Sequence, residues 1–274
     1  MTKAIRMMER EIALVDSVIY VLDARAPLAC INEAFDAVIG MKPVLYVLNK
    51  ADRVRPEDCK AWLDRFASEG KRCIATDSVS KKDAPAIVKG LLELNAALLE
   101  RYRLKGVNKT LRAMVIGVPN CGKSTLINSL LRQKKATTGN RPGVTRGKQW
   151  VAIDRYIELL DSPGVTYPDF RDQDKALRLA LIGSIKDEVV DPVELADAAL
   201  SFLSAHDPEA LKARYGIEAL PTSAADRMEA VGQRRGMMLK GGEVDLLRTA
   251  NAVITDFRKG AFGKIILESA RDGI

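Results

Sequence analysis

The sequence predicts an α/β fold followed by a smaller, mainly helical domain. Three observations lead to this class. The 274 residues are enough for two domains of ordinary size. Short apolar runs alternate with amphipathic stretches up to about residue 172, which is the strand-helix pattern of an open parallel sheet. Beyond that point helix signals replace the strand signals. We therefore expect one domain over residues 1–174 and a second over residues 175–274.

The elements of the first domain follow from apolar runs that end in polar residues. The predicted strands are residues 18–22, 44–48, 73–76, 111–117, 150–153 and 157–160. Helices are predicted over residues 86–102 and 123–131, and a flexible basic segment over residues 132–148. Because open α/β sheets bind ligands at the carboxyl ends of their strands, the polar residues after these runs are the candidate site.

The second domain is predicted from helix starts and one amphipathic stretch. Asp191-Pro192 and Asp207-Pro208 each combine a capping residue with proline at the first helical position. Between Leu246 and Phe257 apolar residues recur three and four positions apart, after an entry through Gly241-Gly242. No internal repeat is visible.

Composition excludes several classes of protein. Apolar residues make up 47% and charged residues 29%, as in a folded rather than a disordered chain. No apolar run approaches the roughly 18 residues of a membrane span, and residues 1–10 carry mixed charge rather than a signal-peptide core. The 4 cysteines lack paired spacing, so we expect free thiols. A cytoplasmic monomer without a membrane partner is the expectation.

The net charge of +7 is unevenly distributed. Residues 101–153 hold 12 Lys and Arg and no Asp or Glu, and residues 227–264 hold 8 basic and 4 acidic residues. Residues 178–226 instead hold 4 basic and 9 acidic residues. The basic stretches indicate either ordinary solvated surface or contact with a nucleic-acid phosphate backbone.

A phosphate-binding loop is predicted at residues 117–124, which read Gly-Val-Pro-Asn-Cys-Gly-Lys-Ser. Glycines let backbone N–H groups approach a β-phosphate, Lys123 can reach the β- and γ-phosphates, and the Ser124 hydroxyl can bind magnesium. A strand before the loop and a helix after it are the context that such a loop needs. The competing interpretation is a glycine turn with an incidental lysine.

A guanine-recognition element is predicted at Asn49-Lys50-Ala51-Asp52. The Asp52 carboxylate can accept hydrogen bonds from the ring N1–H and the amino group of guanine, a pair that adenine does not offer. Lys50 would lie along the ring, and Asn49 would tie the loop to neighbouring backbone. Alone, these residues also suit a plain strand-to-helix turn. After the next strand, Thr76-Asp77-Ser78 either caps the guanine through its backbone or caps a helix.

The order of these motifs is reversed relative to small GTPases, because the guanine element precedes the phosphate loop. The sequence therefore predicts a circularly permuted GTPase. Two switch segments would complete the site: Asp161-Ser162-Pro163-Gly164, with Asp161 holding magnesium through water and the Gly164 N–H on the γ-phosphate, and Arg141-Pro142-Gly143-Val144-Thr145, with Thr145 on magnesium. The glycine and proline of the second segment also suit an ordinary turn.

The complete set of expected site residues joins these segments. The residues expected to bind GTP or GDP are Asn49, Lys50, Ala51, Asp52, Asp77, Ser78, Asn120, Cys121, Gly122, Lys123, Ser124, Thr125 and Gly164. The expected magnesium ligands are Ser124, Thr145 and Asp161, and the groups assigned to catalysis are Lys123, Thr145 and Gly164. Because residues after Gly164 lead into the second domain, we expect γ-phosphate contacts to set the position of that domain.

Taken with this motif order, the Asp23-Ala24-Arg25-Ala26-Pro27 run and residues 234–242 (Arg-Arg-Gly-Met-Met-Leu-Lys-Gly-Gly) closely resemble the YlqF/RbgA family. Its members are circularly permuted GTPases of large-subunit ribosome assembly. The resemblance covers nearly the whole chain. It implies a permuted Ras-like P-loop domain, a helical RNA-binding domain, and precursor large-subunit rRNA as partner. It also implies activation by potassium, with Asn120 helping to bind the ion. The alternative role of Asn120 is only to brace the phosphate loop.

The chain departs from common GTPase patterns at the water-positioning group. Val165 stands where many GTPases have glutamine, a replacement that the resembled family shares. Those relatives also carry an aromatic-Pro-Gly-His segment before the position of Met1, which this sequence does not hold. We expect a truncated or misassigned start and slow intrinsic turnover. The only histidine, His206, is interpreted as a helix-end residue.

Three functions remain to be separated. The first is a GTPase switch that binds precursor large subunits with GTP and leaves after hydrolysis. The second is a nucleotide-gated RNA-binding protein with negligible hydrolysis, and the third is a permuted GTPase of small-subunit assembly. The Asp23-Ala24-Arg25 run is either a sharp turn with Asp23 and Arg25 paired, or a contact to RNA or a switch.

Overall fold

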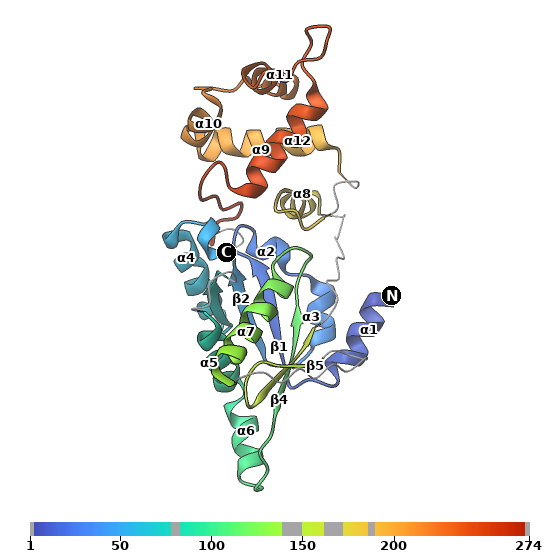
Figure 1. The fold of residues 1–274 in the computed structure, drawn as a ribbon, viewed down its shortest axis with the longest axis vertical. Helices are drawn as coiled ribbons and strands as arrows, with labels where there is room; N and C mark the ends of the chain where they lie inside the picture. Colours follow the sequence, from blue (N-terminus) through green and yellow to red (C-terminus); the bar gives the residue numbers. More distant parts are fainter. Residues whose placement is uncertain (1–2, 78–82, 139–149, 162–171, 186–189, 272–274) are drawn as a thin grey trace. The chain divides into compact units, whose positions relative to one another are not determined.

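The computed structural model describes residues 3–77, 83–138, 150–161, 172–185 and 190–271. The chain divides into two compact units, coloured by sequence in Figure 1. The first unit comprises Met1–Tyr167 and Glu268–Ile274, and the second comprises Pro168–Leu267.

The first unit contains a six-stranded sheet with helices on both faces. Its strands are β1 (Ser17–Asp23), β2 (Val44–Asn49), β3 (Arg72–Thr76), β4 (Leu111–Ile116), β5 (Trp150–Ala152) and β6 (Ile157–Asp161). Its helices are α1 (Lys3–Ile12), α2 (Pro27–Cys30), α3 (Glu33–Ile39), the 3₁₀ helix η1 (Ala51–Arg53), α4 (Pro56–Ser68), α5 (Ala84–Leu94), α6 (Ala96–Arg103) and α7 (Lys123–Thr138).

The strand order of the sheet is β3-β2-β1-β4-β6-β5. The pairs from β3 to β6 are parallel, and only β5 runs antiparallel to its neighbour. The six predicted strands are confirmed. Because β1, β2 and β4 are adjacent and parallel, the loops after them lie at the same edge of the sheet, although they are far apart in the sequence.

One face of the sheet carries a layer of buried aromatic side chains. Tyr20 of β1 stacks on its register partner Tyr46 of β2, with ring centroids 5.8 Å apart. Phe35 of α3 and Phe66 of α4 contact these two rings, and Trp62 extends the layer along α4. Fully burying a side chain of this size contributes roughly 1.5–3 kcal/mol, so this layer fixes α3 and α4 on the sheet.

The opposite face is covered by α5 and α7, which lie side by side in Figure 1 and contact each other. Gly90 lets α5 approach the sheet closely, because a Cβ there would lie 2.8 Å from Ile74 Cδ1 and 3.3 Å from Leu45 Cδ1. Leu45 and Tyr46 are consecutive in β2 and point to opposite faces, as strand geometry requires. The phosphate-loop strand β4 therefore lies inside a sheet covered on both sides.

Two predictions about helices of the first unit are wrong. The stretch 86–102 is not one helix, because the chain breaks at Asn95 between α5 and α6. Asn95 Nδ2 donates to Leu91 O at 2.8 Å, and such local bonding by asparagine competes with continued helical bonding. Residues 132–138 are not a flexible segment but the last two turns of α7. Residues 139–148 of that basic stretch lie outside the described residues.

The second unit is a helical bundle with α9 at its centre. Its helices are α8 (Gln173–Leu181), α9 (Pro192–His206), α10 (Pro208–Tyr215), α11 (Ala224–Arg234) and α12 (Leu246–Lys259). As predicted, Asp191 and Asp207 cap α9 and α10 through side-chain bonds to backbone N–H groups. The α12 prediction also holds, with Asp245 rather than the two glycines as the capping residue. His206 ends α9, as expected.

No helix in the described ranges combines the length and the apolar composition that a membrane crossing requires. All four cysteines are free thiols, of which Cys30 and Cys121 are buried.

The domain boundaries differ from the prediction at both ends of the helical unit. Helix α8 begins before residue 175, and the last seven residues of the chain belong to the first unit. Glu268, a buried carboxylate with 2% exposure, attaches this C-terminal segment to the rest of the first unit. It accepts hydrogen bonds from Leu28 N at 2.6 Å and Ala29 N at 2.9 Å, at the start of α2. Trp62 Nε1 donates to the Glu268 backbone oxygen at 3.3 Å.

Glu268→Gln is expected to destabilise the first unit by about 2 kcal/mol, because a neutral amide replaces a buried carboxylate that accepts two backbone N–H groups. Both tryptophans, Trp62 and Trp150, lie in this unit, so tryptophan fluorescence during urea unfolding reports on it alone. The matched control is Glu100→Gln, at an exposed ion pair with Arg103 in the same unit. If Glu268→Gln changed the free energy of unfolding by less than about 0.5 kcal/mol, these hydrogen bonds would not be what holds the C-terminal segment on the first unit.

Candidate nucleotide site

The loops that carry the predicted motifs meet at the carboxyl ends of four neighbouring strands. Asp23 of β1 pairs in register with Asn49 of β2, and Asn49 pairs with Thr76 of β3. On the other side of β1, Tyr20 pairs with Ile116, the last residue of β4 before the phosphate loop. The guanine element and the phosphate loop are therefore neighbours in space.

The phosphate loop has a backbone that only glycine allows at two positions. Gly117 has φ 149° and Gly122 has φ 102°. A Cβ on Gly117 would lie 2.3 Å from Val21 O, and a Cβ on Gly122 would lie 2.0 Å from Asn49 Nδ2. Neither position accepts a side chain, because backbone and the guanine element occupy that space. The two glycines therefore let the phosphate loop pack directly against β1 and against the guanine element.

Lys123 lies at the first position of α7 and is buried, with 7% exposure. Its ammonium donates to Gly117 O at 2.9 Å and to Val118 O at 2.8 Å. The lysine is therefore held across the phosphate loop, next to the helix N-terminus that favours anions. Ser124 and Thr125 follow it and are exposed.

The guanine element is bonded directly to the phosphate loop. Asn49 Nδ2 donates to Cys121 O at 2.7 Å, and Lys50 Nζ donates to Asn120 O at 2.7 Å. Cys121 itself is buried, and burial raises the pKa of its thiol, so the group is a neutral part of the loop packing. The two motifs are thus one structural unit.

Asp52 lies in η1 with 46% of its side chain exposed, 3.2 Å from Arg53 Nε. It lines a small pocket with residues from both motifs and from the end of β3. The other lining residues are Asn49, Lys50, Arg53, Asp77, Gly122 and Thr125. A carboxylate at the rim of this pocket is free of burial costs and can accept donors from a base edge.

After β3, the structure tests the helix-capping alternative for Thr76 and Asp77 but not for Ser78. Thr76 donates to Asn49 Oδ1 at 3.4 Å, and the Asp77 N–H donates to Asp83 Oδ2 at 2.8 Å. The described helix after β3 begins only at Ala84, so Thr76 and Asp77 do not cap it. Ser78 lies outside the described residues.

Most of the predicted magnesium site is not covered by the structure. Thr145, Gly164 and Val165 lie outside the described residues, and Asp161 is described only as the backbone end of β6. Ser124 is the one predicted magnesium ligand whose side chain is described.

The Asp23-Ala24-Arg25 run is a turn with its charges paired. Both oxygens of Asp23 accept from Arg25, at 2.9 Å from Nε and 2.8 Å from Nη2. Sequence reasoning missed a further contact, because Asp23 Oδ2 also lies 2.8 Å from Lys50 Nζ. Burial alone raises the pKa of the Asp23 carboxyl, but Arg25 and Lys50 outweigh it and lower that pKa below its ordinary value.

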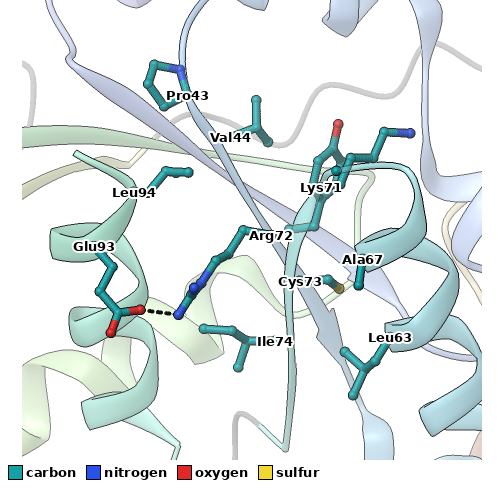
Figure 2. Close-up of a pocket in the computed structure, with 12 residues that line it drawn as sticks. Pro43, Val44, Leu63, Ala67, Lys71, Arg72, Cys73, Ile74, Glu93 and Leu94 are labelled. Atoms are coloured by element: carbon teal, nitrogen blue, oxygen red, sulfur yellow. Dashed lines mark hydrogen bonds and ion pairs between the residues drawn. The ribbon is translucent and has the colours of Figure 1, made fainter. Parts of the chain in front are cut away.

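A second and wider cleft, of about 950 Å³, lies elsewhere in the first unit (Figure 2). It is bordered by the starts of β2 and β3 and the ends of α4 and α5, and an Arg72–Glu93 ion pair crosses it. This is the amino end of the parallel strands, which has neither the glycine loop nor the helix N-terminus of the motif edge. Its size therefore does not make it the nucleotide site.

A phosphate loop and a guanine element at one sheet edge, in reversed chain order, define a circularly permuted P-loop GTPase. A family model described as "50S ribosome-binding GTPase" matches residues 112–214, which begin in β4 and leave out the guanine element. That extent agrees with the permutation.

Three similar proteins identify the family. Ribosome biogenesis GTPase A of Priestia megaterium is 40% identical over 265 residues, covering 96% of this chain and 92% of the relative. Mitochondrial ribosome-associated GTPase 1 of Bos taurus is 32% identical over 288 residues, covering 98% and 86%. The crystal structure of GNP-bound YlqF from T. maritima is 28% identical, with a TM-score of 0.68 over 99% of this chain and 100% of that one.

The chain belongs to the ribosome biogenesis GTPase A family, YlqF/RbgA. It is a GTPase and binds guanine nucleotides. The predictions of the fold class, the permutation and the family are confirmed.

Proposed function

We propose that this GTPase is an assembly factor for the large ribosomal subunit that binds rRNA of the precursor particle with GTP and leaves after hydrolysis. The observation that carries the proposal is the bonded pair of guanine and phosphate loops, in a chain similar over nearly its full length to GTPases named for ribosome biogenesis. The matching family is described as a 50S ribosome-binding GTPase, which favours the large subunit.

Exposed cations support an RNA partner. In the first unit, Arg101, Arg103 and Lys105 are exposed at the end of α6 and after it. In the second unit, exposed basic residues lie at the end of α11, on the segment between α11 and α12 and at the start of α12: Arg234, Arg235, Lys240 and Arg248. Contacts of such residues with a phosphate backbone gain from counterion release.

The described residues fit a guanosine triphosphate with its base at Asp52 and its phosphates at the loop. Gly117 and Gly122 let the loop pack against β1 and the guanine element. Lys123 supplies a positive charge beside the loop, and Lys50 would lie along the base. Ser124 would hold magnesium, with Thr145 and Asp161 as the further ligands. The ion would neutralise charge on the β- and γ-phosphates. Potassium at Asn120 is part of the proposal.

Hydrolysis is proposed to be slow until the ribosomal particle contributes. The side chain of Val165 has no hydrogen-bonding group to orient water, so another group, potassium or the particle must do so. We further propose that γ-phosphate contacts at Thr145 and Gly164 order the switches and thereby set the position of the helical unit.

The proposal predicts that the chain co-sediments with precursor large subunits at least about tenfold better with a non-hydrolysable GTP analogue than with GDP. It also predicts that these particles raise the single-turnover rate of GTP hydrolysis by at least about tenfold. Mature large subunits and precursor small subunits are the controls.

Two outcomes would replace the proposal. GTP-dependent binding with an unchanged hydrolysis rate would favour the nucleotide-gated RNA-binding protein, for which Val165 argues. Co-sedimentation with precursor small subunits instead would favour small-subunit assembly. Brisk hydrolysis by the isolated chain would contradict the dependence on the particle.

A further inference from the structure

Lys50 is held in a conformation that needs support. Its backbone is in the left-handed region, with φ 60° and ψ 35°. Asn120, whose backbone oxygen accepts a hydrogen bond from the Lys50 ammonium, is also left-handed, with φ 57°. These are the two non-glycine residues with positive φ in the described part of the chain. A lysine seldom adopts this conformation, so the surrounding structure must hold it there. The Lys50 side chain has two such contacts, with Asn120 O and with Asp23.

Besides Asn120 O, the Lys50 ammonium contacts the buried carboxylate of Asp23. Asp23 has 0% exposure and Arg25 has 7%. Besides the two side-chain bonds, the Arg25 N–H donates to Asp23 Oδ1 at 3.1 Å. The bidentate geometry prevents rotation of the carboxylate, so Oδ2 is presented to Lys50 Nζ in one direction.

A buried ion pair of this kind is weak evidence for stability, since apolar residues of similar volume often serve as well. Its presence here is better explained by Lys50, the third charged residue in contact with it. The Asp23–Arg25 pair lies at the end of β1, between the guanine loop after β2 and the phosphate loop after β4. It is thus positioned to act on the one lysine that connects these loops.

We propose that Asp23 is a positioning residue for nucleotide binding: with Arg25 it fixes Lys50, so that the stem of Lys50 lies beside the guanine ring while its ammonium holds the phosphate loop at Asn120. The role is indirect, because Asp23 is buried and acts through Lys50. The proposal rests on guanine-nucleotide binding and not on the ribosomal role, so its failure would leave that role untouched.

The test is the rate at which a fluorescent GDP analogue leaves the full chain. Asp23→Asn is expected to release it about tenfold faster, the effect of losing one charge-assisted hydrogen bond. Because Asp23→Asn leaves Arg25 buried without its charge partner, a second variant is needed. Asp23→Asn combined with Arg25→Met removes both charges and is expected to stay folded and show the same faster release.

A role that is only structural would not depend on Lys50. Lys50→Met keeps the stem but removes the ammonium, and is expected to speed release by a similar factor. In the Lys50→Met background, adding Asp23→Asn is expected to change release by less than about twofold, because the two residues act through one contact.

The matched control is Asp256→Asn in the helical unit. Asp256 also accepts from an arginine through two bonds, from Arg214 at 3.0 and 2.7 Å, but lies outside the nucleotide-binding unit. We expect it to lower thermal stability without changing GDP release. Release within about twofold of the parent chain in the folded Asp23→Asn/Arg25→Met variant would overturn the proposal, as would multiplying effects of Asp23→Asn and Lys50→Met.

Discussion

Asp52→Asn is expected to weaken GDP binding by about 100-fold and to strengthen the binding of xanthosine diphosphate. The carboxylate can accept both the N1–H and the 2-amino group of guanine, and hydrogen bonds to a charged group contribute about 1.5–3 kcal/mol each. Losing one of them and its charge corresponds to about 100-fold in affinity. Xanthine has a carbonyl in place of the amino group, which the new amide NH₂ can meet.

The structure separates this effect from folding. Asp52 is 46% exposed, and its ion pair with Arg53 lies at the surface, where such pairs contribute little to stability. Competition binding of GDP, xanthosine diphosphate and ADP measures the change. Asp58→Asn is the control, since Asp58 is a partly exposed aspartate with a nearby arginine on α4, outside the pocket. Unchanged GDP affinity in Asp52→Asn would contradict the role of Asp52 as the base reader.

Lys123→Met is expected to lower the rate of GTP hydrolysis by at least about 1000-fold. Its ammonium is buried across the phosphate loop and is the one cation of that loop, so methionine removes the positive charge from the place where negative charge develops on the transferred group. Affinity for GTP is expected to fall as well, since on our proposal Lys123 contacts the β- and γ-phosphates in both ground and transition states.

Single-turnover hydrolysis with the ribosomal particle present measures this loss against the fastest rate of the parent chain. Lys71→Met is the matched control. Lys71 is a lysine of the same unit that lines the wider cleft of Figure 2, so its replacement also tests whether that cleft takes part. We expect Lys71→Met to keep the parent rate. Loss of hydrolysis in Lys71→Met, with hydrolysis kept in Lys123→Met, would place the reaction in the wider cleft and contradict our account.

Local patterns were enough to predict the sheet and both motifs. Apolar runs ending in polar residues located all six strands, and the caps at Asp191 and Asp207 located two helices. The phosphate loop is recognisable because its glycines are required by local backbone geometry, as the positive φ angles of Gly117 and Gly122 show. In each case the cause lies within a few residues of the signal.

Features that depend on distant residues were not predictable in this way. Glu268 caps α2 across 240 positions of sequence, and nothing near Glu268 indicates a partner in the first unit. The contact of Asp23 with Lys50 likewise depends on the pairing of β1 with β2. The sequence predicted the pairing of Asp23 with Arg25 as one of two alternatives, since these residues are two positions apart, but nothing in it indicated Lys50 as a third partner. The break at Asn95 was missed because apolar periodicity continues across it.

The central claim is that loops from two distant parts of the chain enclose one guanine nucleotide. A crystal structure of the chain with magnesium and a non-hydrolysable GTP analogue tests it most directly. We predict a single nucleotide whose base is bonded to Asp52 and whose β-phosphate is surrounded by the loop around Lys123. A nucleotide bound at the loop with its base turned away from Asp52, or bound in the wider cleft, would contradict the account.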